Sequence, residues 1–244
     1  LRTLGECVIE VDGLPLGPGA DTVFPALVYL TAERGRHLSR VGLADLFWPG
    51  ATPARGRHSL RQLLYRLRAL GVPIEATRER VSLPESAVAP TFAAQPTRDR
   101  LREAQAQGTL VIGAFLPGFA PECSPAYADW LDAQRSAVES QVRRALLDAA
   151  HEHQLRGEWA EVDALARECL RIDPLNEAAT ILRAQCAAML GARAEALEIL
   201  DRYGAELGAA RADLGRPVAA LRKRIAEQFP ARRYAIPSDR CFVG

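Results

Sequence analysis

The chain has 244 residues, which is long for one typical domain and short for three, so we expect two domains. Hydrophobic residues make up 48% and charged residues 25%, close to ordinary globular usage, which argues against extended disorder and against a fibrous protein. No apolar run approaches the roughly 20 residues that span a bilayer, and no export signal is visible. We therefore expect a protein that neither enters a membrane nor is exported.

Net charge and cysteine usage narrow the class further. The 31 Lys and Arg residues nearly balance the 30 Asp and Glu residues, so the net charge of +1 indicates no partner. All basic residues but Lys223 are arginines, a bias that a GC-rich genome explains as well as nucleic-acid binding does. Five scattered cysteines without CxxC spacing argue against a disulfide framework or a zinc site and favour a reducing cytoplasm: Cys7, Cys123, Cys169, Cys186 and Cys241. We expect Cys169 and Cys186 to be buried free thiols.

The first part of the chain predicts strands, then three helices, then a hairpin. The turn pair Asp12-Gly13 favours a tight hairpin, Ser39 is a plausible N-cap, and Gly71 a helix stop. The predicted elements are two short strands over 7–16, helices over 21–34, 39–47 and 53–70, and two short strands over 74–77 and 80–83. This is the element order of a winged helix with an extra N-terminal sheet.

The second part predicts almost only helices. Residues 84–108 are rich in Ala, Pro and Gln and hold the interdomain connection, with at most one short helix over 97–107. Similar Ala-rich segments follow, and Gly157 and Gly191 are 34 residues apart, the period of tetratricopeptide (TPR) repeats. A helix over 217–229 would cap the stack. The expected fold is mainly α with a small β component: a winged helix-turn-helix domain followed by an all-α TPR-like domain.

The predicted helix over 53–70 carries five arginines and no acid. At about 100° per residue, one stripe faces the core: Leu60, Leu63, Leu64, Leu67 and Leu70. The opposite face holds Arg55, His58, Arg61, Gln62, Tyr65 and Arg66, with Arg57 and Arg68 at its margins. Such a face suits a DNA major groove, because Arg can bind guanine, Gln can bind adenine, and flanking Arg and Tyr can contact phosphates.

An arginine-rich helix face is more often merely solvated. Its context favours DNA binding here, because a helix and turn precede it and a hairpin with Arg78 and Arg80 follows it.

The other candidate sites are weak. His151 and His153 are two residues apart and cannot chelate one metal from a helix, and Trp48, Trp130 and Trp159 are expected in the core. With no phosphate-binding loop or nucleophile motif, we expect no cofactor, no metal and no catalysis.

Two blocks of the first domain, residues 39–49 and 57–68, resemble the OmpR/PhoB-type winged helix. Among winged helices of this type, the two blocks resemble the form found in the antibiotic-regulatory-protein (SARP) family of bacterial activators. Residues 113–119, Trp130-Leu131, Arg135 and residues 173–177 look like the bacterial transcriptional activator domain of that family, a TPR-like module. The resemblance covers about residues 4–228. Residues 242–244 are similar to the opening of the nucleotide-binding ATPase that follows these domains in longer members.

The resemblance implies a sequence-specific transcriptional activator that binds repeated promoter elements in double-stranded DNA as a homodimer and contacts RNA polymerase. Its location would be the bacterial cytoplasm, at the nucleoid when bound. The expected organisation is a DNA-binding domain over 1–86, a linker over 87–108, a helical activator domain over 109–230, and a tail over 231–244 leading to a further domain. The alternative is a TPR-type protein-interaction scaffold that does not bind DNA, and an enzyme is a distant third.

Overall fold

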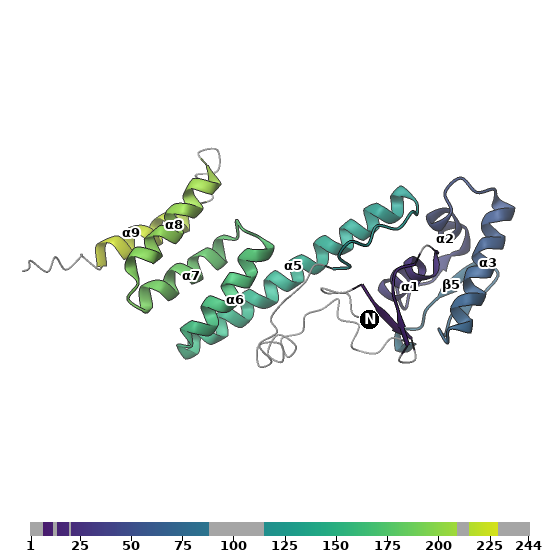
Figure 1. Ribbon diagram of the computed structural model, residues 1–244, viewed down its shortest axis with the longest axis horizontal. Helices are drawn as coiled ribbons and strands as arrows, with labels where there is room; N and C mark the ends of the chain where they lie inside the picture. Colours follow the sequence, from purple (N-terminus) through teal and green to yellow (C-terminus); the bar gives the residue numbers. More distant parts are fainter. Residues whose placement is uncertain (1–6, 12–13, 20, 88–114, 209–214, 229–244) are drawn as a thin grey trace, which may run out of the picture. The chain divides into compact units, whose positions relative to one another are not determined.

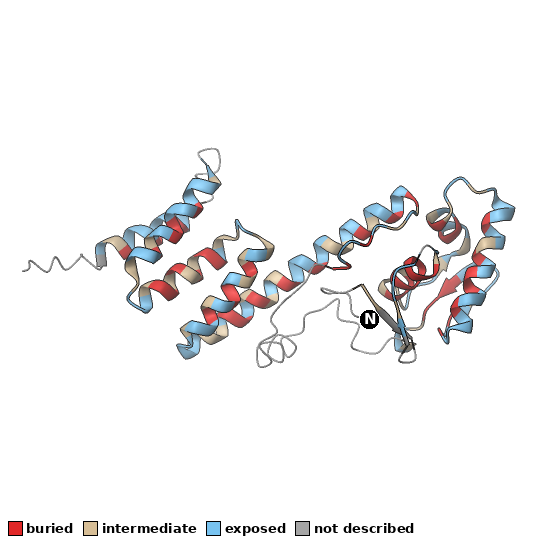
Figure 2. Cartoon of the chain, in the orientation of Figure 1, coloured by how far each residue is buried: buried red, intermediate tan, exposed pale blue. Residues whose placement is uncertain are grey.

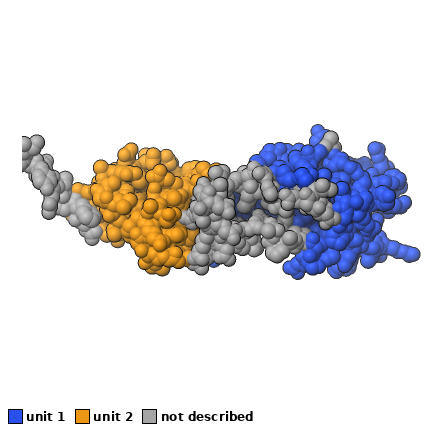
Figure 3. Space-filling model, turned by 60° about the horizontal axis from the view of Figure 1, so that its bottom comes forward, with its two compact units in different colours: residues 1–145 blue, residues 146–244 orange. Residues whose placement is uncertain are grey.

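The computed structural model describes residues 7–11, 14–19, 21–87, 115–208 and 215–228 (Figure 1). These residues form a mainly helical protein with a small β component. Contacts divide the chain into two compact units, residues 1–145 and 146–244 (Figure 3), and the division falls inside the long helix α5 (Pro125–Arg156). The helix expected over 97–107, the tail over 231–244 and Cys241 lie outside the described residues.

The first unit contains all the described strands. Its elements are β1 (Ile9–Val11), β2 (Leu14–Leu16), α1 (Val23–Ala32), β3 (Leu38–Ser39), α2 (Arg40–Phe47), α3 (Pro53–Ala69), β4 (Glu75–Ala76), β5 (Arg80–Ser82), the short 3-10 helix η1 (Glu85–Ala87) and the start of α5. The strands β1 and β2 pair as an antiparallel hairpin. The other strands form an antiparallel sheet in the order β3-β5-β4, in which β3 is a strand that the sequence did not predict.

Side-chain caps explain where α2 and α3 begin. The Ser39 hydroxyl accepts a hydrogen bond from the backbone N–H of Gly42 at 3.4 Å, and the Thr52 hydroxyl accepts one from Arg55 N at 3.4 Å. Each bond satisfies a donor that the first helical turn leaves free. Helix α3 ends at Ala69 with Leu70 as its C-cap, and the φ of +86° at the following Gly71 lets the Val72 N–H return to the Leu67 carbonyl at 3.1 Å.

Buried and exposed positions alternate along α3 (Figure 2), and its leucine stripe belongs to the core of the first unit. Leu60, Leu63, Leu64 and Leu67 are buried, as the periodicity predicts. The prediction for Leu70 is wrong: this residue is the C-cap of α3, beyond the last turn that packs, and it is 40% exposed. On the same side of α3, Gly56 packs so close to α2 that an added Cβ would lie 3.2 Å from Ala44 Cβ.

An aromatic cluster joins the start of α5 to α1 and α2. The Tyr127 side chain is fully buried, and its hydroxyl donates a hydrogen bond to the Pro25 carbonyl at 3.0 Å. The indole N–H of Trp130 donates to Glu33 Oε1 at 3.0 Å, and the Trp130 ring lies 4.7 Å from the Tyr29 ring. This packing explains why the first unit extends to residue 145. Trp48, Trp130 and Trp159 are each intermediate in burial, so the expectation that they lie in the core holds only in part.

The second unit contains the end of α5 and four more helices: α6 (Trp159–Ile172), α7 (Glu177–Met189), α8 (Arg193–Leu207) and α9 (Arg216–Gln228). The turns at Gly157 and Gly191 have the same geometry. Their φ values are +74° and +83°, each glycine N–H bonds three residues back, and the next N–H bonds five residues back. The 34-residue spacing therefore marks two equivalent turns between successive helices. Cys169 and Cys186 are buried, as expected, and neither forms a disulfide with a described residue.

Candidate nucleic-acid interface on helix α3

Helix α3 is held by its apolar side and exposes its polar side. The Thr52 cap fixes its start and the buried leucines fix its rotation about its own axis, so the opposite face turns to solvent. All the residues that the sequence assigned to DNA binding are exposed: Arg55, Arg57, His58, Arg61, Gln62, Tyr65, Arg66 and Arg68 on α3, Arg78 in the β4–β5 turn, and Arg80 at the start of β5. Tyr65 is 71% exposed on this face.

The arginines of α3 differ in what they bind. Within the described part of the chain, Arg55, Arg57 and Arg61 make no ion pair and no side-chain hydrogen bond. Arg66 forms an ion pair with Asp21, the residue two positions before α1. Arg68 donates to the Ile74 carbonyl through Nε at 3.4 Å and through a terminal nitrogen at 3.2 Å. Three guanidinium groups are thus free to bind a ligand, and two are engaged within the fold.

The hairpin after α3 is tied to the start of α2. The Arg40 N–H donates to the Glu79 carbonyl at 2.9 Å, and the Arg40 guanidinium donates to the Thr77 carbonyl at 3.2 Å. The Thr77 hydroxyl accepts from the backbone N–H groups of Glu79 and Arg80, which shapes the turn. These bonds fix the backbone from which Arg78 and Arg80 extend their exposed side chains.

Sequence reasoning missed two residues here, Asp21 and Arg40. Asp21 is the acid that α3 itself lacks, and it comes from a segment 45 residues earlier. Arg40 contacts the hairpin from 37 residues away. Neither separation leaves a periodic signal in the sequence, so only the folded chain brings these groups to the site.

The free groups on α3 match the chemistry of duplex DNA. A guanidinium offers planar donors that fit guanine O6 and N7 or a phosphate, and an amide fits adenine N6 and N7. His58 and Tyr65 add further donors on the same exposed face. The helix itself has no acidic side chain, and an anionic ligand near Arg55, Arg57 and Arg61 would meet basic groups that no described residue neutralises.

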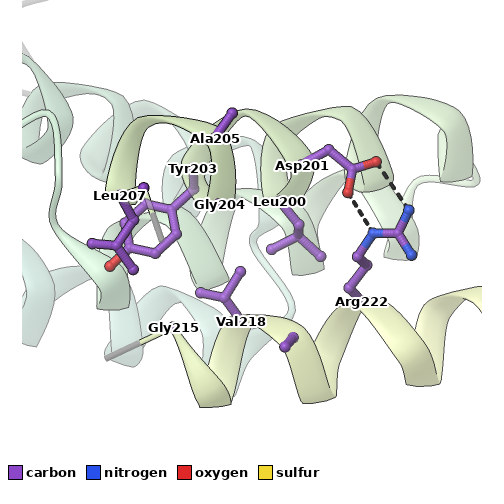
Figure 4. Close-up of a pocket in the computed structure, with 11 residues that line it drawn as sticks. Leu200, Asp201, Tyr203, Gly204, Ala205, Leu207, Gly215, Val218 and Arg222 are labelled. Carbon is purple, nitrogen blue, oxygen red and sulfur yellow. Dashed lines mark hydrogen bonds and ion pairs between the residues drawn. The ribbon is translucent and has the colours of Figure 1, made fainter. Parts of the chain in front are cut away.

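Other parts of the described structure are weaker candidates. In the second unit, a cavity of about 500 Å³ lies between α8 and α9 (Figure 4), where Leu200, Tyr203 and Val218 line its wall and the Asp201–Arg222 ion pair stands at its edge. Among the described residues, no three His, Cys, Asp or Glu side chains gather as metal ligands would. His153 instead contacts Glu158 at 2.5 Å. None of the described helices combines the length and apolarity that crossing a membrane requires.

Comparison with known proteins adds no assignment to this geometry: no model of a known protein family matches the chain, and no curated protein matches it.

Proposed function

We propose that the chain is a sequence-specific DNA-binding transcription regulator of the SARP type, in which α3 enters the major groove. In this proposal the first unit is a winged helix-turn-helix domain, with α2 and α3 as the helix-turn-helix and the β4–β5 hairpin as the wing. The order β3-α2-α3-β4-β5 and the pairing of β3 with β5 support this assignment. The protein would be a binding protein of the bacterial cytoplasm rather than an enzyme.

The observation that carries the proposal is the free basic face of α3. Arg55, Arg57 and Arg61 lack acidic partners among the described residues, and the buried leucines on the opposite side prevent the helix from turning them inward. An ordinary solvated helix in a protein with balanced charge would mix acids with its basic residues, as α6 does with arginines and α9 with Lys223. A face without acids favours a polyanionic partner.

We assign base reading to Arg61 and Gln62 in particular, because both are exposed near the middle of α3 and have side chains that pair bidentately with base edges. Arg55, His58, Tyr65 and Arg66 complete the groove-facing surface. Arg57 and Arg68 at the margins, with Arg78 and Arg80 on the wing, would mainly contact phosphates.

Selection of bound duplexes from a random pool by the whole chain tests the proposal and identifies a site. Binding to that site is then measured by fluorescence anisotropy. Arg61→Ala should weaken it by about 1–3 kcal/mol, or about five- to 150-fold. Arg202→Ala is the matched control, because Arg202 is an exposed arginine of α8 without a partner among the described residues, and it should change affinity less than about twofold. A pool without enriched sequences, or an Arg61→Ala variant that binds as tightly as the wild type, contradicts the proposal.

The second unit would supply the contacts to RNA polymerase or to a second copy of the chain, as a TPR-like helical domain. Large apolar side chains exposed beside its turns suit a protein-binding role: Leu155 is 88% exposed, Met189 62% and Leu190 67%. The same observation would fit a protein-interaction scaffold. Binding of duplex DNA by the wild-type chain distinguishes the two functions, because a scaffold would show no affinity for duplex DNA.

A further inference from the structure

One arginine of the α3 face is held by a carboxylate that is itself held by the backbone. Asp21 Oδ1 accepts a hydrogen bond from the Val23 N–H at 3.1 Å, and its other oxygen, Oδ2, binds the Arg66 guanidinium. The Asp21 side chain is 44% exposed and that of Arg66 54% exposed, so both remain accessible from outside. Because the Val23 bond anchors the carboxylate at the start of α1, Arg66 is restricted to one part of the space that its long side chain could sweep.

This pairing changes what Arg66 can offer to DNA. A guanidinium beside a carboxylate carries no net local charge, so binding a phosphate there would release no counterion and would bring the phosphate toward Asp21. The planar group has five donors, however, and Asp21 occupies only one terminal nitrogen. The remaining donors stay available in one fixed orientation.

We propose that Asp21 is a specificity-determining residue of the α3 face. It orients Arg66 for a contact in the correct complex, and its negative charge opposes phosphates that approach in any other register. The inference rests on the proposed DNA binding and names the residue that limits binding to unrelated sequences. Asp21 lies two residues before the start of α1, and the sequence did not indicate it as a DNA contact.

The test compares Asp21→Asn with Asp129→Asn in the whole chain. Asparagine at position 21 can still accept the Val23 N–H bond but does not carry the charge. Asp129 is an exposed carboxylate on α5 without a partner among the described residues, so its substitution changes the net charge equally. Affinity is measured by anisotropy at several salt concentrations, for the selected duplex and for a duplex of scrambled sequence. Circular dichroism melting verifies that each variant is folded.

Asp21→Asn should tighten binding to the scrambled duplex about three- to tenfold and steepen its salt dependence by about 0.9, the value of one added phosphate contact. Binding to the selected duplex should change less than about twofold, so the ratio of the two affinities falls. In an Arg66→Ala background, Asp21→Asn should no longer steepen the salt dependence by that 0.9, because no guanidinium is left there to bind the phosphate. Asp129→Asn should leave both affinities within about twofold.

Three results would overturn the inference: an equal gain for both duplexes, an equal gain in Asp129→Asn, or a salt dependence that still steepens by about 0.9 without Arg66. Each is distinct from failure of the proposed function itself, which would appear as a wild-type chain without affinity for either duplex.

Discussion

The aromatic cluster around Tyr127 should be a main source of stability for the first unit. Tyr127 is fully buried, its ring centroid lies 5.8 Å from that of Phe47 and 5.2 Å from that of Trp130, and its hydroxyl bonds the Pro25 carbonyl. Truncating a buried aromatic side chain to alanine costs about 3–5 kcal/mol, and losing one hydrogen bond about 0.5–1.5 kcal/mol. We therefore expect Tyr127→Ala to lower the free energy of unfolding by about 4 kcal/mol and Tyr127→Phe by about 1 kcal/mol.

Urea denaturation followed by tryptophan fluorescence measures this change in the first unit. In a Trp159→Phe background the remaining indoles, Trp48 and Trp130, both report on that unit. Tyr65→Ala is the matched control, because it removes the same atoms from a side chain that is 71% exposed, and it should shift the free energy of unfolding by less than about 0.5 kcal/mol. If Tyr127→Ala unfolds at the same urea concentration as Tyr65→Ala, the cluster is not a stabilising core.

The same reasoning sets the limits of a stable fragment. A fragment of residues 1–90 lacks Tyr127 and Trp130. The ring surfaces of Tyr29 and Phe47 that pack against these residues would then be exposed to solvent. A fragment of residues 1–145 retains the whole cluster. We expect the longer fragment to unfold cooperatively at a higher urea concentration, and equal stability of the two would show that α5 adds nothing to the first unit.

Three further predictions concern the second unit. Gly191→Ala should destabilise the second unit by about 1–2 kcal/mol, because alanine is strained at a φ of +83°. Gly204→Ala lies inside α8 with open space around the added Cβ, and it should stabilise this unit by up to about 1 kcal/mol. Thermal melting of the two variants measures the difference. Burial raises the pKa of the Cys186 thiol to about 11, so at pH 8 only about 0.1% is thiolate and iodoacetamide should label it only after unfolding, as mass spectrometry would show. The hydrogen bond from Arg222 lowers the pKa of Asp201 below its usual 3.8. The stabilisation that the ionised Asp201 provides should therefore be present at neutral pH and disappear as the pH falls through that lowered pKa. The difference in stability between the wild type and Asp201→Asn should shrink over the same fall in pH.

The helices of the first unit could be predicted because local signals mark them. Ser39 caps α2 in the structure as its position suggested, and the leucine period of α3 gives its buried side without knowledge of its partners. The same period could not exclude Leu70, because the end of a helix depends on whether packing continues beyond it. Strand β3 has two residues and exists through its pairing with β5, which no local pattern encodes.

The exposure of the polar face of α3 was predictable from the sequence, whereas the ion pair at this face was not. Exposure of the α3 face follows from the helical period alone, whereas the Asp21–Arg66 pair joins segments 45 residues apart. The role of α5 likewise depended on tertiary packing, since Tyr127 and Trp130 belong to a helix that the sequence assigned to the second domain. A contact between two single side chains far apart in the sequence leaves no periodic pattern, so it cannot be predicted from the sequence.

A nearly neutral chain can still present a strongly basic surface if its acids are placed elsewhere. In the second unit, Asp163 lies between Arg167 and Arg183, and such paired guanidiniums would release no counterions on meeting DNA. The free arginines should therefore set the salt dependence of binding, with a logarithmic slope of about −0.9 for each phosphate contacted. Arg57→Ala, which removes a proposed phosphate contact, should make that slope shallower by about 0.9. Arg61→Ala should weaken binding with little change in slope if Arg61 reads a base, and a shallower slope in this variant would reassign Arg61 to the backbone.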